Sequence, residues 1–285
     1  MSEHFDLVVI GAGPAGEKGA AQAAYFGKSV CLVERAPKPG GAAVNSGTIP
    51  SKTLRETALA LSALRQKGLY GVEFHVRPDI SISDFMRRER GVVEASWRLI
   101  EENLERHHVF TVQGAARFTG PQAIEVTRHG QEPRVITGDT FLVATGSHPW
   151  RAPHVPFDGA VVIDSDDVLA IEAIPARMIV IGGGVIGCEY ACTFAALGVQ
   201  VTIINAGDRL LTQFDHDVSD ALRQEFTRRF GIHTLLGADV SSIEVHDGLG
   251  HVTVADGTML VAECVLYCAG HEGNTAGLGL ENAGV

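Results

Sequence analysis

The stretch of sequence that decides the fold is residues 6–16, DLVVIGAGPAG, in which an apolar, β-branched run ends in a glycine-rich turn. The small residues after this turn predict a helix that ends at Gly27, and residues 29–33 form a second apolar run followed by Glu34. This order predicts a strand, a helix and a second strand, with the pattern G-x-G-x-x-G between the first strand and the helix. In this context the pattern indicates a dinucleotide-binding unit.

Each part of the turn has a physical role in such a unit. Gly11 permits the tight turn, Gly13 lets the backbone approach a pyrophosphate, and Gly16 allows the helix to pack closely on the strand. The helix N-terminus faces the phosphate charge, and Glu34 can accept hydrogen bonds from a ribose diol. We therefore predict a cofactor site that contains Gly11, Gly13, Pro14, Ala15, Gly16, Glu34 and Arg35.

The same arrangement occurs again 171 positions later, counted from Gly11 to Gly182. Residues 178–181 are an apolar run that enters GGGVIG, followed by a predicted helix to Leu197 and a predicted strand over residues 200–204. Two nucleotide sites on one chain indicate transfer between two nucleotides. The second site is predicted to contain Gly182, Gly184, Val185, Ile186, Gly187, Asn205 and Arg209.

The acid expected at the end of the second unit's second strand is absent, and Asn205 stands there instead. A carboxylate would favour a free 2′-hydroxyl and repel a 2′-phosphate, whereas basic groups would do the reverse. Asn205 does neither strongly, and Arg209 has two open roles: to reach a 2′-phosphate or to pair with a nearby carboxylate. The sequence is therefore permissive for both NAD and NADP.

The composition narrows the function classes. The chain has 285 residues, enough for two domains, and a formal net charge of −11 without a basic block. It is therefore a poor candidate for nucleic acid or for an anionic membrane surface. No run approaches the roughly 18 apolar residues of a membrane span, and the N-terminus lacks a signal-peptide layout, so we expect a cytoplasmic protein. The five cysteines form no Cys-x-x-Cys pair, are expected to be buried, and predict no metal site.

Periodicity predicts the remaining elements. Helices are expected over residues 53–67, begun near Ser51, over residues 81–107, capped by Ser83 or Asp84, and over residues 217–230. Short strands between residues 109 and 141 (VFTVQGAARF, AIEVTR, RVITG and DTFLVAT) predict a small antiparallel or mixed layer, and proline-rich residues 150–159 predict the inter-domain connection.

Residues 40–52, GGAAVNSGTIPSK, complete a resemblance to a known family. With both glycine turns and the sequence Ala144-Thr145-Gly146, they make the chain resemble the flavin disulfide reductases (the glutathione reductase and dihydrolipoyl dehydrogenase group) from residue 5 to the end. The family's two redox cysteines correspond to Ala43 and Thr48, so the disulfide is missing. Within the group, the chain is most similar to the soluble FAD-dependent pyridine nucleotide transhydrogenases, because of Thr48, the turn Gly273-Asn274-Thr275 and the strand end at Asn205.

The resemblance implies an α/β fold with two Rossmann-like domains of the three-layer ββα type, the second inserted in the first. Residues 1–150 would bind FAD, residues 151–275 would bind NAD(P), and residues 276–285 would begin the return to the FAD domain. The family's remaining FAD segment and its dimerisation domain have no counterpart in this sequence. We therefore expect a C-terminally truncated chain that forms a homodimer only where that domain is present.

The resemblance also assigns roles to single residues. Lys52 matches the lysine beside the flavin N5 edge, and Glu189 matches the glutamate that pairs with it, in a buried and strongly coupled pair. These two are the predicted catalytic residues, and the cofactors implied are FAD and NAD(P)H. Further cofactor-binding positions carried over from the family are Gly41, Ala42, Thr48, Lys52, Ala115, Ala144, Thr145, Gly146, Glu189 and Gly270.

The implied activity is hydride transfer from NADPH to NAD through the flavin, with no protein nucleophile and no disulfide relay. Two alternatives stay open at this point. One is a disulfide reductase related to dihydrolipoyl dehydrogenase, against which Ala43 and Thr48 count. The other is a non-catalytic fragment that holds NAD(P) but retains no FAD.

Overall fold

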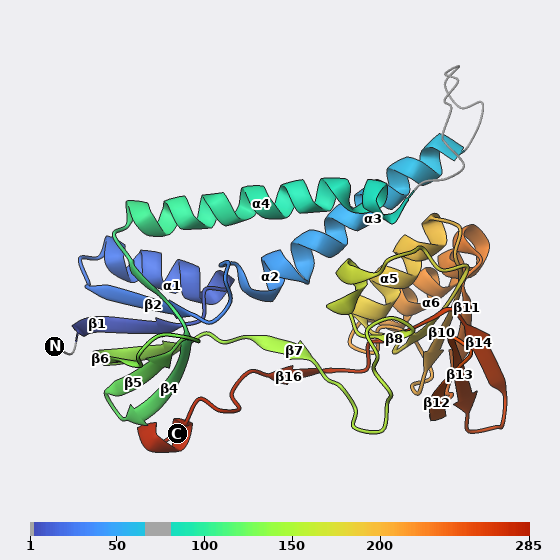
Figure 1. Cartoon of the computed structure of the whole chain (residues 1–285). Coiled ribbons are helices and arrows are strands. Elements are labelled where there is room, and N and C mark those ends of the chain that lie inside the picture. The colour runs from blue at the N-terminus through green and yellow to red at the C-terminus, as the bar shows by residue number, and fades with distance from the viewer. Residues whose placement is uncertain (1–2, 66–80) are drawn as a thin grey trace. The chain divides into compact units, whose positions relative to one another are not determined.

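The structure is a computed structural model that describes residues 3–65 and 81–285, and it forms two compact units (Figure 1). Unit 1 contains Met1–Ile49, Gly91–His148 and Glu272–Val285, and unit 2 contains Pro50–Arg90 and Pro149–His271. Most of unit 2 is thus inserted between two segments of unit 1, which confirms the predicted nested α/β fold. The units differ from the predicted domain limits, since Pro50–Arg90 groups with unit 2. Which cofactor each unit binds stays a prediction.

Unit 1 is built on a six-stranded sheet in the order β3-β2-β1-β6-β5-β4. Strands β3, β2, β1 and β6 are parallel, and β5 and β4 continue the sheet in antiparallel pairing. The sequences RVITG and DTFLVAT were predicted as separate strands, but residues 134–143 form one long strand, β6, which ends before Ala144 and Thr145. The bounds are β1 Glu3–Ile10, β2 Val30–Glu34, β3 Phe110–Gln113, β4 Ala115–Gly120, β5 Ala123–Thr127 and β6 Arg134–Val143.

The C-terminal part of β1, Val8–Ile10, is buried on both faces of the sheet, which explains why its sequence is continuously apolar there. Val9 packs against Ala20 of helix α1 (Pro14–Tyr25) on one face of the sheet. Val8 packs on the opposite face, in a cluster with Phe118 and Ile124 of the antiparallel strands. Because side chains alternate along a strand, this pattern produces the three layers that the family resemblance implied: helices, parallel sheet and antiparallel strands.

Unit 2 repeats this construction (Figure 1). Its parallel sheet has the order β11-β10-β9-β15-β8, and β12, β13 and β14 form a separate antiparallel sheet. Val180 of β9 packs with Phe194 of helix α5, whereas Ile179 packs with Ile243 and Val252 of the antiparallel sheet. The bounds are β8 Val162–Ile163, β9 Arg177–Ile181, α5 Val185–Ala196, β10 Gln200–Asn205, α6 His216–Glu225, β11 His233–Leu236, β12 Val240–His246, β13 Leu249–Val254, β14 Met259–Ala262 and β15 Cys264–Tyr267.

Several boundaries differ from the prediction. Helix α4 (Ile82–Arg106) is capped by Ser81 rather than by Ser83 or Asp84. The Asp84 backbone N–H donates to Ser81 Oγ at 3.1 Å, and the Ser81 N–H donates to Asp84 Oδ2 at 3.2 Å. This reciprocal pair is a capping box. Helix α3 begins at Thr48, before the predicted start, and the end predicted at Lys67 lies outside the described residues. The predicted helix over residues 217–230 divides into α6 and a π-helical turn, η3 (Phe226–Phe230).

Among the described residues, no helix is long and apolar enough to cross a membrane. The elements not yet given are short or lie where the chain passes between the two units. Their bounds are α2 Gly41–Asn45, α3 Thr48–Arg65, β7 Ser147–Pro149, η2 Asp167–Ala170, β16 His271–Gly273 and η4 Leu280–Ala283.

Candidate nucleotide-binding sites

The first glycine turn contains two glycines that the fold itself requires. Gly11 has a φ of +105°, and a Cβ there would lie 2.5 Å from the Ala144 carbonyl oxygen. A Cβ on Gly16 would lie 1.8 Å from the Gly11 carbonyl oxygen. Gly13 differs, because it has ordinary backbone angles and its nearest neighbour would be Gly41 Cα at 3.7 Å. It is the N-cap of α1, so the space beside it adjoins the helix N-terminus, where an anion binds favourably.

Glu34 ties this turn to the loop that follows β2. Its Oε2 accepts a hydrogen bond from the Ala12 N–H at 2.7 Å, and its Oε1 accepts one from the Ala36 N–H at 2.8 Å. A carboxylate oxygen has two lone pairs, so each oxygen can still accept a hydrogen bond from a ribose hydroxyl. Glu34 therefore stabilises the turn and can also accept a hydrogen bond from a ligand.

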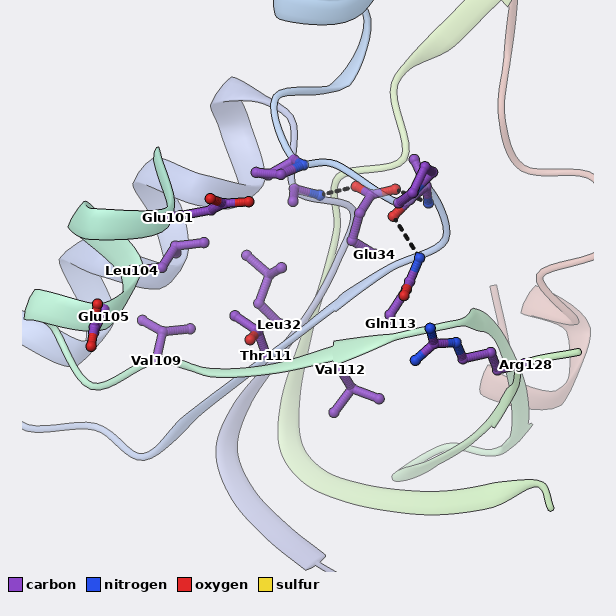
Figure 2. Close-up of a pocket in the computed structure, with 14 residues that line it drawn as sticks. Leu32, Glu34, Glu101, Leu104, Glu105, Val109, Thr111, Val112, Gln113 and Arg128 are labelled. Atoms are coloured by element: carbon purple, nitrogen blue, oxygen red, sulfur yellow. Dashed lines mark hydrogen bonds between the residues drawn. The ribbon is translucent and has the colours of Figure 1, made fainter. Parts of the chain in front are cut away.

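A cavity of about 520 Å³ lies beside Glu34, at the carboxyl ends of the parallel strands. Figure 2 shows Glu101 and Glu105 of α4 on one side of the cavity and Gln113 and Arg128 on the other. Among the residues predicted for the site, Glu34 is the one that lines this cavity, whereas Arg35 and Ala115 are exposed outside it. The lining residues are Ala12, Leu32, Glu34, Ala36, Pro37, Pro39, Glu101, Leu104, Glu105, Val109, Thr111, Val112, Gln113 and Arg128.

Gln113 is a lining residue that the motifs did not identify. It ends β3, which pairs with β2, and its Nε2 donates to the Ala36 carbonyl at 3.5 Å. Since the carboxyl ends of neighbouring parallel strands meet at one edge of a sheet, assigning β3 to the parallel sheet would have identified it.

The second glycine turn has the same division of roles. Gly182 has a φ of +112°, and a Cβ there would lie 2.5 Å from the Cys268 carbonyl oxygen. A Cβ on Gly187 would lie 2.1 Å from the Gly182 carbonyl oxygen. A Cβ on Gly184, the N-cap of α5, would meet nothing among the described residues within 4 Å. Gly13 and Gly184, the N-cap residues of α1 and α5, therefore leave free space at a helix N-terminus.

Asn205 makes three hydrogen bonds to the backbone of unit 2. Its Oδ1 accepts from the Gly183 N–H at 2.8 Å, and its Nδ2 donates to the carbonyls of Gly207 at 3.1 Å and Arg209 at 3.0 Å. The side-chain amide is thus committed to the loop that follows β10.

Arg209 pairs with main-chain carbonyls rather than with the carboxylate considered from the sequence. Its Nη1 donates to the Phe214 carbonyl at 2.9 Å, and its Nη2 donates to the Thr212 carbonyl at 2.8 Å. Among the described residues it forms no ion pair. A guanidinium has five N–H donors, so further donors remain for a ligand.

A second cavity, of about 510 Å³, lies at the carboxyl ends of the strands of unit 2. It brings together the predicted residues Gly182, Gly184, Asn205 and Gly270 but not Val185, Ile186, Gly187 or Arg209. His154 and Val155 line it without a sequence signal, because they lie in the proline-rich stretch interpreted as a connection. The lining residues are His154, Val155, Ile181, Gly182, Gly183, Gly184, Ile204, Asn205, Ala206, Ala238, Val240, Ile243, Tyr267, Cys268, Ala269 and Gly270.

The structure brings Lys52 and Glu189 together within unit 2. Lys52 Nζ of α3 lies 3.6 Å from Glu189 Oε1 of α5, and Ser51 Oγ donates to Glu189 Oε2 at 3.2 Å. The expectation of a buried pair is wrong, because 66% of the Lys52 side chain is exposed. Solvent screens the two charges, so this ion pair adds little stability and leaves the ammonium free to contact a ligand.

The predicted Ala144-Thr145-Gly146 turn is held by the final turn of the sequence. Asn274 Nδ2 donates to the Thr145 carbonyl at 2.8 Å, and the Asn274 N–H donates to the Gly146 carbonyl at 2.9 Å. The Ala144 N–H donates to the Ile10 carbonyl at 2.8 Å, which places this turn beside the first glycine turn. The other predicted positions, Gly41 and Ala42, lie in α2, and Thr48 begins α3.

The five cysteines are free thiols in the structure. Burial raises the pKa of Cys31, Cys188 and Cys264 to about 12 and also raises the pKa of Cys192 and of Cys268. A thiol of high pKa is a weak nucleophile at neutral pH, so these residues are suited to packing. In the described part of the chain, no group of three or more His, Cys, Asp or Glu side chains could hold a metal ion.

Two three-layer units, each with a glycine turn at the carboxyl end of a parallel sheet and a free helix N-terminus, define an α/β protein with two dinucleotide-binding units. The chain belongs to the pyridine nucleotide-disulphide oxidoreductase family, which it matches over residues 5–285.

Curated relatives and solved structures agree with this assignment. The chain is 40% identical over 282 residues to a soluble pyridine nucleotide transhydrogenase of Mycobacterium bovis and 36% identical over 283 residues to one of Photorhabdus laumondii. Each match covers 99% of this chain and 60% of the relative, so the chain spans about three fifths of these relatives' length. The crystal structure of LpdA from Mycobacterium tuberculosis is similar, with a TM-score of 0.90 and 28% identity over 99% of this chain and 62% of LpdA. The flavoprotein disulfide reductase RclA from Escherichia coli, in its Cu(II) complex, has a TM-score of 0.85 and 27% identity over 100% of this chain and 60% of RclA.

Proposed function

We propose that the chain is an FAD-dependent oxidoreductase that transfers hydride between NADPH and NAD through the flavin, without a redox disulfide. The observation that carries this proposal is the repeated glycine turn. In each unit the last glycine of the turn (Gly16 or Gly187) is required by packing. The glycine three positions before it (Gly13 or Gly184) leaves space at a helix N-terminus, as binding of a pyrophosphate requires. Two such sites on one chain fit two different dinucleotides.

FAD fits the features of unit 1. Gly13 and the α1 N-terminus would hold the pyrophosphate, and Glu34 would accept hydrogen bonds from the ribose beside the 520 Å³ cavity. When bound, FAD supplies the group that accepts and returns the hydride.

The pyridine nucleotides fit unit 2. Gly184 and the α5 N-terminus would hold their pyrophosphate, and Asn205, a neutral side chain, would repel neither a 2′-hydroxyl nor a 2′-phosphate. Lys52 and Glu189, both of unit 2, would orient the nicotinamide for hydride transfer. NADPH and NAD are thus the proposed substrates.

The absence of cysteine at positions 43 and 48 favours this proposal over disulfide reduction. Ala43 and Thr48 occupy those positions, and neither side chain can form a disulfide. The cysteines present elsewhere have raised pKa values, which disfavour the thiolate needed to relay electrons.

The visible absorbance spectrum of the purified 285-residue protein tests the proposal. We expect a flavin spectrum, reconstituted with FAD if necessary, that bleaches with anaerobic NADPH and recovers when NAD is added. A protein that takes up no FAD would contradict it and leave at most a nucleotide-binding function. Bleaching that recovers with a disulfide substrate but not with NAD would favour disulfide reduction instead.

A further inference from the structure

The cavity of unit 2 contains very few groups that can carry charge. Among the described residues that line it, none is Lys or Arg, and the titratable side chains are His154, Tyr267 and Cys268. Burial raises the pKa of Tyr267 and of Cys268, so both are neutral around pH 7. His154 is therefore the lining side chain that can present a positive charge to a ligand.

The backbone around His154 is fixed, whereas its side chain is exposed. Val155 is buried and packs with Tyr267 and Ile243, and the Val155 N–H donates to the carbonyl oxygen of the buried Ala152 at 3.0 Å. In the described structure the imidazole of His154 makes no hydrogen bond and no ion pair. Both ring nitrogens are thus available, from a position that the loop anchors at the cavity wall.

Charged groups on the same loop are already compensated. The Arg151 guanidinium donates to Asp164 Oδ2 and Asp167 Oδ2, each at 2.7 Å. Asp158 Oδ1 accepts from three successive backbone N–H groups, those of residues 160–162, at 2.8–2.9 Å. Arg151 and Asp158 are therefore both engaged elsewhere, and neither occupies the imidazole of His154 in place of a ligand.

The other elements around the cavity contribute no further charge to its lining. Asp239 lies in the chain between the lining residues Ala238 and Val240 but does not itself line the cavity. His271 follows the lining residue Gly270 and does not line it either. On β12, Glu244 and His246 pair with each other at 2.8 Å. These charges lie outside the cavity wall.

We propose that His154 is a nucleotide-binding residue that contacts a phosphate group of the pyridine nucleotide and tightens binding as the pH falls. This inference rests on the proposed nucleotide site of unit 2. The α5 N-terminus offers partial positive charge to a pyrophosphate, and a protonated imidazole adds a full charge and a charge-assisted hydrogen bond. Imidazole is the side chain whose charge ordinarily changes between pH 5 and pH 8. The phosphate is either the pyrophosphate, common to both nucleotides, or the 2′-phosphate of NADP.

Isothermal titration calorimetry on the 285-residue protein tests this inference with oxidised NAD and NADP, which cannot donate hydride. Binding is measured at pH 8 and pH 6, at constant ionic strength, for the unchanged protein, for His154→Gln and for His233→Gln. His233 is an exposed histidine of the same unit that does not line the cavity, so its variant is the matched control. The nucleotide's own titration is common to all three proteins and cancels in the comparison.

We expect the unchanged protein and His233→Gln to bind more tightly, by roughly tenfold or more, at pH 6 than at pH 8, as one additional hydrogen bond from a charged group predicts. We expect His154→Gln to lose this gain. A loss confined to NADP identifies the 2′-phosphate as the contact, and an equal loss for both nucleotides identifies the pyrophosphate. Identical pH responses of His154→Gln and the unchanged protein would overturn the role of His154 alone. Failure of the unchanged protein to bind either nucleotide would overturn the site in unit 2 as well.

Discussion

Glu34 and Asn205 hold the two glycine turns in the same way, from the ends of β2 and β10. Each offers a side-chain oxygen to the backbone N–H of the second residue of its turn, Ala12 at 2.7 Å for Glu34 and Gly183 at 2.8 Å for Asn205. They differ in the second contact. Glu34 accepts another N–H, from Ala36, whereas the Asn205 amide donates to two carbonyls. The loop after β10 is therefore constructed around an amide and not around an acid.

This difference predicts the effect of Asn205→Asp. The carboxylate would keep the contact to Gly183 but would face the carbonyls of Gly207 and Arg209 without a donor. We expect a loss of about 1–3 kcal/mol in the free energy of unfolding at pH 7 and a larger loss of affinity for NADP than for NAD, because like charges repel. Thermal denaturation and calorimetric titration provide the two measurements.

A pH series supplies the control for this substitution. Below about pH 4 the new carboxyl protonates and regains one donor, so the stability gap between Asn205→Asp and the unchanged protein should narrow. A gap that is absent at pH 7, or that widens in acid, would contradict the role given to the amide.

Gly187, which is closely packed, and Gly184, which is next to open space, predict opposite effects of alanine substitution on stability and on nucleotide binding. Gly187→Ala places a Cβ 2.1 Å from the Gly182 carbonyl oxygen, so we expect destabilisation by about 3 kcal/mol or more. Gly184→Ala meets no described atom within 4 Å, so we expect a change in stability of less than about 0.5 kcal/mol. The added methyl would nevertheless occupy the space beside the helix N-terminus and weaken nucleotide binding by about tenfold or more.

Chemical denaturation and calorimetric titration of both variants test this division. Gly184→Ala that binds NAD and NADP as tightly as the unchanged protein would contradict the proposed position of the pyrophosphate. Gly187→Ala that remains fully stable would contradict the packing argument and leave the nucleotide proposal untouched.

The sequence predicted the two units because glycine spacing and apolar runs are local signals. It failed at β6, which was divided between Gly138 and Asp139. In the structure Gly138 does not end the strand: a Cβ there would lie 2.7 Å from Val8 Cγ2, so glycine serves close packing against β1 within a continuous ladder. A glycine that ends a strand and one that lets two strands approach have the same sequence signature.

The candidate sites divide along the same line. The turn residues that carry the glycine motif were predicted, since the motif encodes backbone geometry. The lining residues Gln113 and His154 were not predicted, because they come from a strand end and a loop whose positions depend on sheet order. The exposure of Lys52 was not predicted either, since the family resemblance identifies Glu189 as its partner but does not indicate how much solvent reaches the two side chains.

The exposed ion pair predicts a large effect on rate and a small one on stability. Lys52→Gln should change the free energy of unfolding by less than about 1 kcal/mol, because most of the lysine side chain is in solvent. The rate of flavin reduction by NADPH should fall by about tenfold or more if Lys52 orients the reacting groups. Stopped-flow absorbance of the FAD-loaded protein measures that rate.

Arg88→Gln is the matched control for Lys52→Gln. Arg88 pairs with Glu56 at 3.1 Å on exposed surface of the same unit, with 59% of its side chain exposed. It should produce the same small change in stability with no change in rate. Equal rates for Lys52→Gln and Arg88→Gln would exclude an orienting role for Lys52, and recovery of the rate in Lys52→Arg would support it.

Arg177 and Glu263 predict a pH-dependent contribution to the stability of unit 2. Arg177 Nη2 lies 2.7 Å from Glu263 Oε1, and this hydrogen bond lowers the pKa of Glu263 from 4.5 to about 2. A carboxyl whose folded pKa is depressed stabilises the protein above its unfolded pKa and loses that contribution as the pH falls towards the folded value. The stabilisation should therefore be complete above about pH 5 and decline between about pH 4.5 and pH 2.

Arg177→Gln, compared with Arg177→Lys, measures this contribution. Because both side chains are partly exposed and solvent screens their charges, we expect Arg177→Gln to lower the stability only slightly at pH 7. That cost should shrink as the pH falls below about 4.5, since protonation of Glu263 removes the same interaction from the unchanged protein. Arg177→Lys keeps the charge but not the guanidinium geometry, so its cost should be smaller. Urea denaturation at several pH values, followed on unit 2, would contradict this account if the cost of Arg177→Gln were constant or grew in acid, because either result would place its origin in packing rather than in the charge of Glu263.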